Sequence, residues 1–155
     1  METERALSVG AAAMTHTELG LAGERFVALL LRRAGVPVER GGPADLLANG
    51  TAIEVKAARP SARAGGRRPG FQFCLRRDGR NGRAKTDVRK SVLTVLLCYP
   101  RDGDEPIAAF VVPSQQLGNR RKVTISAPNP RTYNGKWSVY LDSWGIMARI
   151  LESEQ

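Results

Sequence analysis

The chain has 155 residues and a formal net charge of +9, from 24 lysines and arginines against 15 acidic residues. This length suits one domain with a single hydrophobic core, and no apolar stretch reaches the roughly twenty residues of a membrane span. There is also no charged and apolar leader with a cleavage site, so we expect an intracellular, cytoplasmic protein.

Histidine and cysteine are scarce. His16 is the only histidine, which excludes nuclease mechanisms that need two or more histidines as ligand and base. Cys74 and Cys98 lie in separate apolar, strand-like runs, so they are predicted to be buried free thiols rather than a zinc site or a disulfide. The candidate catalytic groups are therefore carboxylates and lysine.

The first predicted helix spans residues 17–34. Thr15 is its expected N-cap, Glu18 is the capping-box partner three residues later, and Gly35 ends it. At about 100° per residue, Glu24 projects from the apolar face of this helix. A carboxylate there needs a partner. It is either paired with an arginine or, as we favour, joins other carboxylates in a site.

A β-hairpin is predicted immediately after this helix. Asn49-Gly50 between apolar runs is a strong signal for a two-residue type I′ turn. The implied register places Asp45 opposite Glu54, with Cβ atoms about 5 Å apart. Lys56 follows two residues after Glu54, so its side chain points to the same face of the strand.

Two facing carboxylates destabilise a hairpin unless a cation lies between them. Their oxygens suit Mg²⁺ or Mn²⁺, which can lower the pKa of an attacking water and neutralise phosphate oxygens. A neighbouring lysine orients the water or offsets charge in the transition state. The pattern therefore favours hydrolysis of a phosphodiester, against the alternative of a surface hairpin with scattered charges.

These residues resemble the PD-(D/E)XK nucleases and, within them, the archaeal Holliday-junction resolvases. The resemblance runs over about residues 17–58 and begins with Gly20-Leu-Ala-Gly-Glu24-Arg25. It continues through the leucine-rich end of the helix to Asp45-Leu-Leu-Ala-Asn-Gly and Ile53-Glu-Val-Lys56. It implies that Glu24, Asp45, Glu54 and Lys56 are catalytic, and that the first three of them bind the metal.

The resemblance also implies a fold and a partner. The expected fold is α/β, with a restriction-endonuclease-like core in which helices flank a mixed central sheet in a single domain. The expected assembly is a homodimer that acts on branched or duplex DNA with Mg²⁺ or Mn²⁺. We expect a disordered extension over residues 1–14 and the nuclease domain over 15–155, with a basic insert at about 59–90 that the resolvases lack.

The charge of that insert supports a nucleic-acid substrate. Residues 59–90 hold eleven basic and two acidic side chains, so the segment alone carries a net charge of +9. Clustering of this kind is typical of phosphate contact, although a basic run is often only a solvated face. The predicted DNA-binding residues are Arg59, Arg63, Arg67, Arg68, Arg76, Arg77, Arg80, Arg83 and Lys85.

Residues 71–75 alternate like a strand. Gln72 would face the same side as Lys56 if the sheet continues, as an accessory group near the metal or as a plain polar residue of an edge strand. Residues 76–90 are predicted to form a basic loop. The apolar run at 92–99 then suits a central strand.

Further strands are predicted at residues 107–112 and 123–125. Ser114 is expected to cap a short helix between them, which Gly118 ends. From Lys136 onward the aromatic residues have helical spacing and predict a helix with a core or interface stripe. Tyr133 is the better candidate for contact with a partner.

The predicted function is a divalent-metal-dependent DNA endonuclease, structure-specific like a junction resolvase. One alternative is a site-specific restriction or homing endonuclease, which cuts linear duplex at fixed positions. Another is a nucleic-acid-binding module that has the fold without turnover. RNA remains an open substrate.

Overall fold

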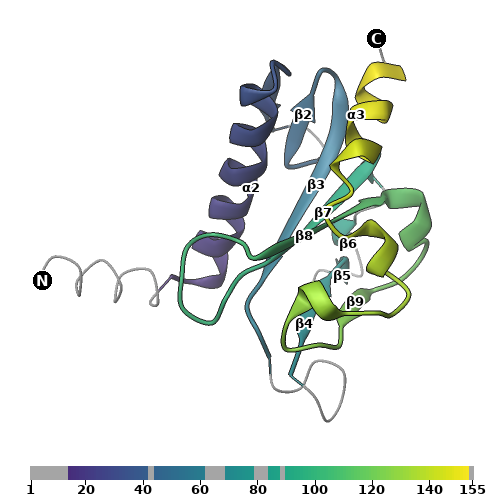
Figure 1. Cartoon of the computed structure of the whole chain (residues 1–155). Coiled ribbons are helices and arrows are strands. Elements are labelled where there is room, and N and C mark those ends of the chain that lie inside the picture. The colour runs from purple at the N-terminus through teal and green to yellow at the C-terminus, as the bar shows by residue number, and fades with distance from the viewer. Residues whose placement is uncertain (1–13, 42–43, 62–68, 79–83, 88–89, 154–155) are drawn as a thin grey trace, which may run out of the picture.

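The computed structural model describes residues 14–41, 44–61, 69–78, 84–87 and 90–153. Five strands form its central sheet in the order β1-β2-β3-β7-β8 (Figure 1). Only β3 and β7 run parallel, so the sheet is mixed as predicted. Its strands are β1 (Val38–Arg40), β2 (Leu46–Ala48), β3 (Thr51–Ala58), β7 (Leu93–Cys98) and β8 (Ala108–Pro113).

Strand β7 lies inside the sheet between β3 and β8, and all six of its residues are buried. Burial on both faces explains why its sequence is a continuous apolar run rather than an alternating one. The prediction of a central strand here is confirmed. The predicted strand at residues 107–112 is β8, which begins and ends one residue later.

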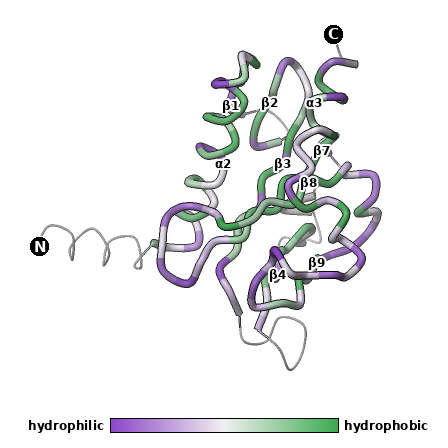
Figure 2. The backbone as a smooth tube through the Cα atoms, in the orientation of Figure 1, coloured by the Kyte–Doolittle hydropathy of each residue, from purple (hydrophilic) through white to green (hydrophobic). Residues whose placement is uncertain are grey.

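Two hydrophobic cores lie on the opposite faces of this sheet. Val95 and Leu97 of β7 join the first, with residues of α2 (His16–Arg33) and α3 (Trp144–Ser153). Leu96 joins the second, with Phe71, Phe73 and other residues of the β4 and β9 strands. In Figure 2 the apolar strands run between these two layers. The helices therefore cover one face, and the short strands cover the other.

Helix α2 begins and ends as its sequence predicts. The Thr15 hydroxyl accepts a hydrogen bond from the Glu18 backbone N–H at 3.1 Å, which makes Thr15 the N-cap. Gly35 follows the C-cap with a φ of 82°, a left-handed conformation that favours glycine. No helix of the described part of the chain is long and apolar enough to cross a membrane.

Outside the central sheet, two short two-stranded antiparallel sheets form. β4 (Phe71–Cys74) pairs antiparallel with β9 (Lys122–Ile125), which confirms both predicted strands. β5 (Arg76–Asp78) pairs with β6 (Ala84–Asp87). The prediction of a continuous basic loop over residues 76–90 is therefore wrong, because cross-strand pairing after Leu75 overrides the polar composition.

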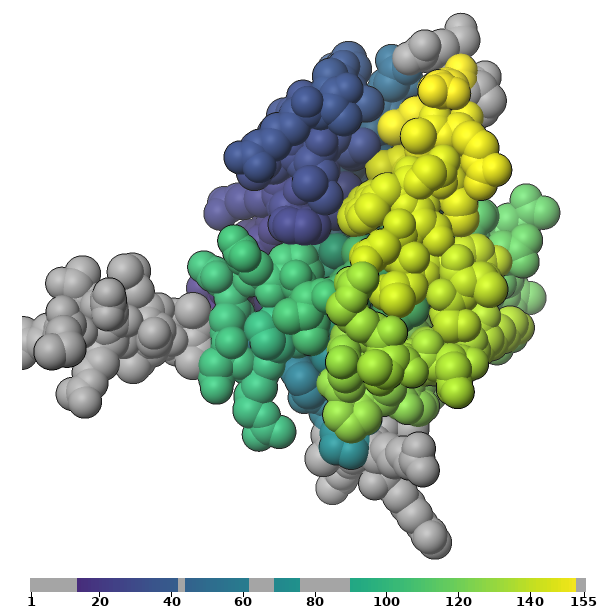
Figure 3. All heavy atoms as spheres, viewed as in Figure 1, coloured from purple at the N-terminus to yellow at the C-terminus, as the bar shows by residue number. Residues whose placement is uncertain are grey.

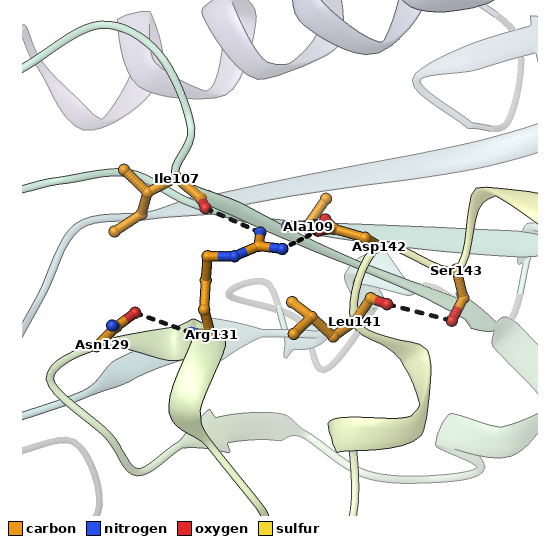
Figure 4. Close-up of polar contacts among 7 residues, drawn as sticks. All are labelled: Ile107, Ala109, Asn129, Arg131, Leu141, Asp142 and Ser143. Carbon is orange, nitrogen blue, oxygen red and sulfur yellow. Dashed lines mark hydrogen bonds and ion pairs between the residues drawn. The ribbon is translucent and has the colours of Figure 1, made fainter.

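The C-terminal segment covers the exposed edge of the sheet. Leu141 bridges Phe110 of β8, and the Asp142 backbone N–H donates to Ala109 O at 2.7 Å. Arg131 forms an ion pair of 2.7 Å with the Asp142 carboxylate (Figure 4). In Figure 3 this segment forms a continuous surface on the face toward the viewer.

The predicted helix from Lys136 onward is wrong over its first part. Asp142 has a φ of 49°, outside the helical range, and it separates the 3-10 turn η4 (Ser138–Tyr140) from α3. Contact with β8 decides this break, which the helical spacing of the aromatic residues does not reveal. Trp137 is nonetheless buried in the second core, as the core interpretation of the aromatic residues expects.

Tyr133 has contacts within the chain, while its contact with a partner stays a prediction, and Cys74 differs from expectation. Tyr133 packs edge-on against Phe110, and its hydroxyl accepts a bond from the Trp137 N–H at 3.4 Å, so within this chain it supports the core. Cys98 is a buried free thiol as predicted, whereas Cys74 is exposed because it points away from the apolar face of β4.

Ser114 does not cap the short helix η2 (Ser114–Leu117), whose N-cap position is Pro113. Its hydroxyl is buried instead and lies 2.8 Å from the hydroxyls of Ser91 and Thr94. The buried hydroxyls of Ser91 and Thr94 need hydrogen-bond partners, so Ser114 bonds to them instead of capping the end of a short helix. Gly118 ends η2 as predicted, with a φ of 56°.

Candidate active site

The Asn-Gly hairpin determines where the first carboxylate lies. Asn49 and Gly50 have φ values of 51° and 85°, the pair of positive values that a type I′ turn requires. The register Leu46↔Ile53, Leu47↔Ala52 and Ala48↔Thr51 is the one predicted. Just beyond the paired residues, Asp45 Oδ2 accepts a hydrogen bond of 2.8 Å from the Val55 N–H. The Asp45 side chain is thereby fixed against β3.

Glu54 and Lys56 lie on one face of β3. Lys56 Nζ is 3.3 Å from Glu54 Oε1, and the side chains are only 16% and 11% exposed. Two charged groups on a largely buried strand face require each other, because each removes part of the cost of burying the other. Val55 between them points into the first core, as the alternation of a strand dictates.

Helix α2 packs on the opposite, Val55 face of β3, and it carries a glycine at its contact with the sheet. A Cβ on Gly23 would lie 3.2 Å from Leu97 Cδ1, closer than most real Cβ contacts, and 3.4 Å from Ala57 Cβ. The missing side chain lets the helix approach β3 and β7. The next residue, Glu24, then faces Asp45 at the edge of the same site.

Glu24 has one positively charged neighbour and one negatively charged neighbour. Its Oε2 lies 3.9 Å from Arg40 Nη2, and Asp45 is on its other side. The two readings of Glu24 from the sequence are thus both realised. The carboxylate is near an arginine, and it also joins the other acids.

Crowding of these acids shifts their ionisation. Burial and the negative charge of Asp45 raise the pKa of Glu54 from 4.5 to about 7, against the lowering effect of Lys56. Burial and Asp45 also raise the pKa of Glu24, and Arg40 offsets part of this. Asp45 is therefore the shared neighbour of two carboxyl groups that resist ionisation. Such perturbed groups in one cleft are typical of functional sites.

These residues line a cleft with a volume of about 350 Å³. Its walls come from the first half of α2, the hairpin, β3 and β4, which are far apart in the sequence. Besides the four predicted catalytic residues, the lining includes His16, Gln72 and Cys74. Gln72 therefore lies near Lys56 as predicted, although β4 reaches the cleft from a separate sheet rather than by continuing the central one.

The carboxylates of the cleft are the candidate ligands for a divalent metal. Among the described residues, no three carboxylate, imidazole or thiol groups converge tightly enough to form a complete protein cage for a metal ion. Mg²⁺ does not need one, because it usually binds through one or two carboxylates together with waters and phosphate oxygens. The hard oxygens of Asp45 and Glu54, beside a second glutamate, fit that pattern, and a cation would relieve the repulsion that raises their pKa values.

The predicted DNA-binding residues are only partly described. Arg59 Nη1 donates to the carbonyl oxygens of Pro100 at 2.7 Å and Gly103 at 2.9 Å, so this guanidinium ties the end of β3 to a turn. The backbones of three others lie in β5 and β6, without described side chains: Arg76, Arg77 and Lys85. The rest lie outside the described residues: Arg63, Arg67, Arg68, Arg80 and Arg83.

Two features of the cleft were missed in the sequence. His16 was interpreted as a helix-start residue, and it does begin α2, but it also lines the cleft. Arg121 and Lys122 lie outside the basic segment 59–90, yet they line a neighbouring groove with Gln72 and Cys74. The adjacent basic residues Arg120, Arg121 and Lys122 were the available signal, but only the pairing of β9 with β4 places them here.

Comparison with known proteins gives one informative likeness. No protein-family model and no curated protein matches this sequence. The solved structure of a bacterial homing endonuclease, I-Ssp6803I, matches with a TM-score of 0.65 and 15% sequence identity, over 86% of this chain and 93% of that chain. The likeness shows a common fold. The predicted fold class is therefore confirmed as a single α/β domain with a mixed central sheet and two helices, in a fold shared with that structure; the two helices cover one face of the sheet rather than both.

Proposed function

We propose that the protein is a divalent-metal-dependent endonuclease that hydrolyses phosphodiester bonds in DNA, with an active site of the PD-(D/E)XK type. The observation that carries this proposal is the meeting of Asp45, Glu54 and Lys56 with Glu24 in one cleft. The sequence resemblance over residues 17–58 and the common fold with a homing endonuclease both support it.

Asp45 and Glu54, with Glu24 beside them, would hold Mg²⁺ or Mn²⁺. The ion would supply Lewis acidity toward the phosphate and the attacking water. The Val55 N–H fixes one oxygen of Asp45 at 2.8 Å, so this carboxylate is oriented before any ligand arrives. Because burial and Asp45 raise the pKa of Glu54 to about 7 without a metal, a proton competes with the ion for this carboxylate near neutral pH.

Lys56 supplies the positive charge. Its ammonium is held 3.3 Å from Glu54 on a side chain that is only 16% exposed, so its interaction with an anion is stronger than that of a fully exposed lysine. When the phosphate gains negative charge in the transition state, Lys56 donates to it or orients the attacking water. Replacing Lys56 removes this stabilisation without removing a metal ligand.

Two kinds of DNA substrate remain from the sequence. The resemblance to resolvases favours branched junctions, but it covers only the catalytic elements. The likeness in fold covers 86% of the chain, and so it also includes elements outside residues 17–58. The matching structure is that of a homing endonuclease. We therefore place site-specific cleavage of linear duplex beside junction cleavage as the second candidate.

Cleavage assays test the proposal. The substrates are a labelled four-way junction, a linear duplex and a single strand, each with Mg²⁺, Mn²⁺ or EDTA. Cutting that needs the metal and is lost in Asp45→Asn supports the nuclease. Cutting confined to the junction selects the resolvase-like enzyme, and discrete products from linear duplex select the site-specific one. The matched control is Asp102→Asn, which removes an exposed carboxylate that does not line the cleft.

The binding-module alternative predicts a different result. Wild type and Asp45→Asn would then bind DNA equally well, and neither would cut with any metal. The proposed homodimer is tested separately by sedimentation of the free protein and of its DNA complex. A monomer in both would remove the dimer from the proposal and leave the chemistry untouched.

A further inference from the structure

The β4–β9 ribbon, formed by Phe71–Cys74 and Lys122–Ile125, has one buried face and one outward face. Phe71, Phe73, Val123 and Ile125 belong to the second core, which anchors the ribbon to the domain. The register pairs Gln72 with Thr124 and Cys74 with Lys122 on the outward face. Four side chains thus form a small polar grid on a rigid base.

This outward face continues directly from the proposed active site. Gln72 and Cys74 line both the carboxylate cleft and a second groove of about 560 Å³, whose other walls include Arg121 and Lys122. The surface therefore changes from acidic to basic along one continuous path. Such a path suits a polyanion whose reacting phosphate lies at the acidic end.

The basic end is held in place by packing. Arg120 lies over the Trp137 ring at 5.3 Å, and Trp137 is itself buried against the second core. Arg120, Arg121 and Lys122 are consecutive, so they place three positive charges where β9 begins. Phosphate contacts by such residues fix the orientation of a duplex.

The dimensions of the ribbon match duplex DNA. The major groove admits a two-stranded β-ribbon, and residues two apart on one strand are separated by about 7 Å, close to two base-pair steps. Glutamine is suited to adenine, and lysine is suited to the O6 and N7 atoms of guanine. The grid thus offers base-reading groups at the correct spacing.

We infer that the outward face of the β4–β9 ribbon enters the major groove of duplex DNA beside the cleaved phosphate and reads two or three base pairs there. The inference rests on the proposed function for its DNA partner and for its position relative to the cut. Lys122 is its principal specificity-determining residue, and Gln72 lies at the boundary between reading and cleavage.

Binding selection tests this without requiring cleavage. The full chain is incubated in EDTA with a library of DNA duplexes that have a randomised central segment, and the bound molecules are sequenced. Wild type is compared with Lys122→Glu and with Arg33→Glu, a matched charge reversal at the exposed end of α2. Thermal melting verifies that all three proteins are equally folded.

We expect both reversals to weaken overall affinity, because each removes a positive charge and adds a negative one. Only Lys122→Glu should change the selected sequence, by about tenfold or more at one or two adjacent base pairs, with guanine giving way to cytosine. With Mg²⁺, those base pairs should border the cut made by the wild-type protein.

An unchanged sequence pattern in Lys122→Glu overturns the inference, because the ribbon would then contact only phosphates. Preferential binding of single strands or RNA duplexes overturns it as well. If the protein selects sequences but never cuts, the proposed nuclease function fails and the inference about the ribbon stands. If the protein cuts DNA but Lys122→Glu leaves its sequence preference unchanged, only the inference about the ribbon fails.

Discussion

Replacing Glu54 with glutamine should stabilise the metal-free protein above neutral pH. The carboxyl group is forced to ionise beside Asp45 in a largely buried position, which raises its pKa from 4.5 to about 7. Glutamine has nearly the same shape without the charge. The substitution therefore removes a destabilising interaction and, at the same time, a group that we propose to be catalytic.

The sign follows from proton binding. Between pH 4.5 and 7 the folded state holds the Glu54 proton more tightly than the unfolded state does. The free energy of unfolding of the wild type therefore falls as pH rises through this window and levels off above it. Glu54→Gln lacks this loss, so the difference between the two proteins should grow from pH 5 to pH 8.

The magnitude is bounded by the same shift. A pKa raised from 4.5 to about 7 corresponds to about 3 kcal/mol once the group is ionised in both states. The cleft admits water and Lys56 balances part of the charge, so we expect about 1–2 kcal/mol. For a domain of this size that is about 2–8 °C in melting temperature.

Thermal and denaturant unfolding in EDTA from pH 5 to 8.5 measure this effect. Glu152→Gln, an exposed carboxylate on α3, is the matched control and should follow the wild type. Added Mg²⁺ should raise the melting temperature of the wild type more than that of Glu54→Gln. A Glu54→Gln protein that is less stable than wild type at pH 8 in EDTA would refute the reasoning, because the ion pair with Lys56 would then outweigh the repulsion.

Three further substitutions test the packing that supports the site. Gly23→Ala should lower the free energy of unfolding by about 1 kcal/mol or less and slow any DNA cleavage, because the strain of a new Cβ 3.2 Å from Leu97 Cδ1 is partly offset by the better helix propensity of alanine; a melting temperature above that of the wild type would contradict this. Ser114→Ala should cost about 1–3 kcal/mol in chemical unfolding, since two buried hydroxyls lose a 2.8 Å partner. Asp142→Ala should cost about 1–2 kcal/mol, because it loses the Arg131 ion pair and leaves a strained residue at a φ of 49°. Asp142→Gly also loses the ion pair but relieves the strain, so it should be the milder change in the same assay.

The carboxylate site was predictable because its geometry is local. Asn49-Gly50 fixes a turn, the turn fixes the register, and the register places Asp45 beside Glu54 and Lys56. Each step depends on residues fewer than a dozen positions apart. The position of Glu24 follows almost as directly, since α2 precedes the hairpin and carries an apolar face.

The second wall of the cleft was not predictable in this way. Gln72 reaches it because β4 pairs with β9, about fifty residues later, and no local pattern specifies that pairing. The break before α3 has the same origin, since Leu141 and Asp142 bond to β8 rather than continue a helix. Long-range pairing overrides local spacing in both cases.

Arg59 shows how little charge alone reveals. It opens the basic segment and is predicted to contact DNA; its Nη1 donates to carbonyl oxygens of the turn after β7, and the residue also lines the groove with Arg121 and Lys122, so the prediction stays open. A count of charges cannot separate an arginine that supports the backbone from one that faces a ligand. Conversely, Lys122, which we propose to contact DNA, lies outside the basic segment 59–90.

The central claim is that Asp45, Glu54 and Lys56 form a hydrolytic centre, and the most direct measurement is the single-turnover cleavage rate with Mg²⁺ on both a four-way junction and plasmid DNA. Wild type, Lys56→Ala and Glu152→Gln are compared at equal, verified folding. The account predicts metal-dependent cutting by wild type and by Glu152→Gln, and a rate at least about 10²-fold lower for Lys56→Ala. Cutting by Lys56→Ala at the wild-type rate, or by wild type in EDTA, would contradict it.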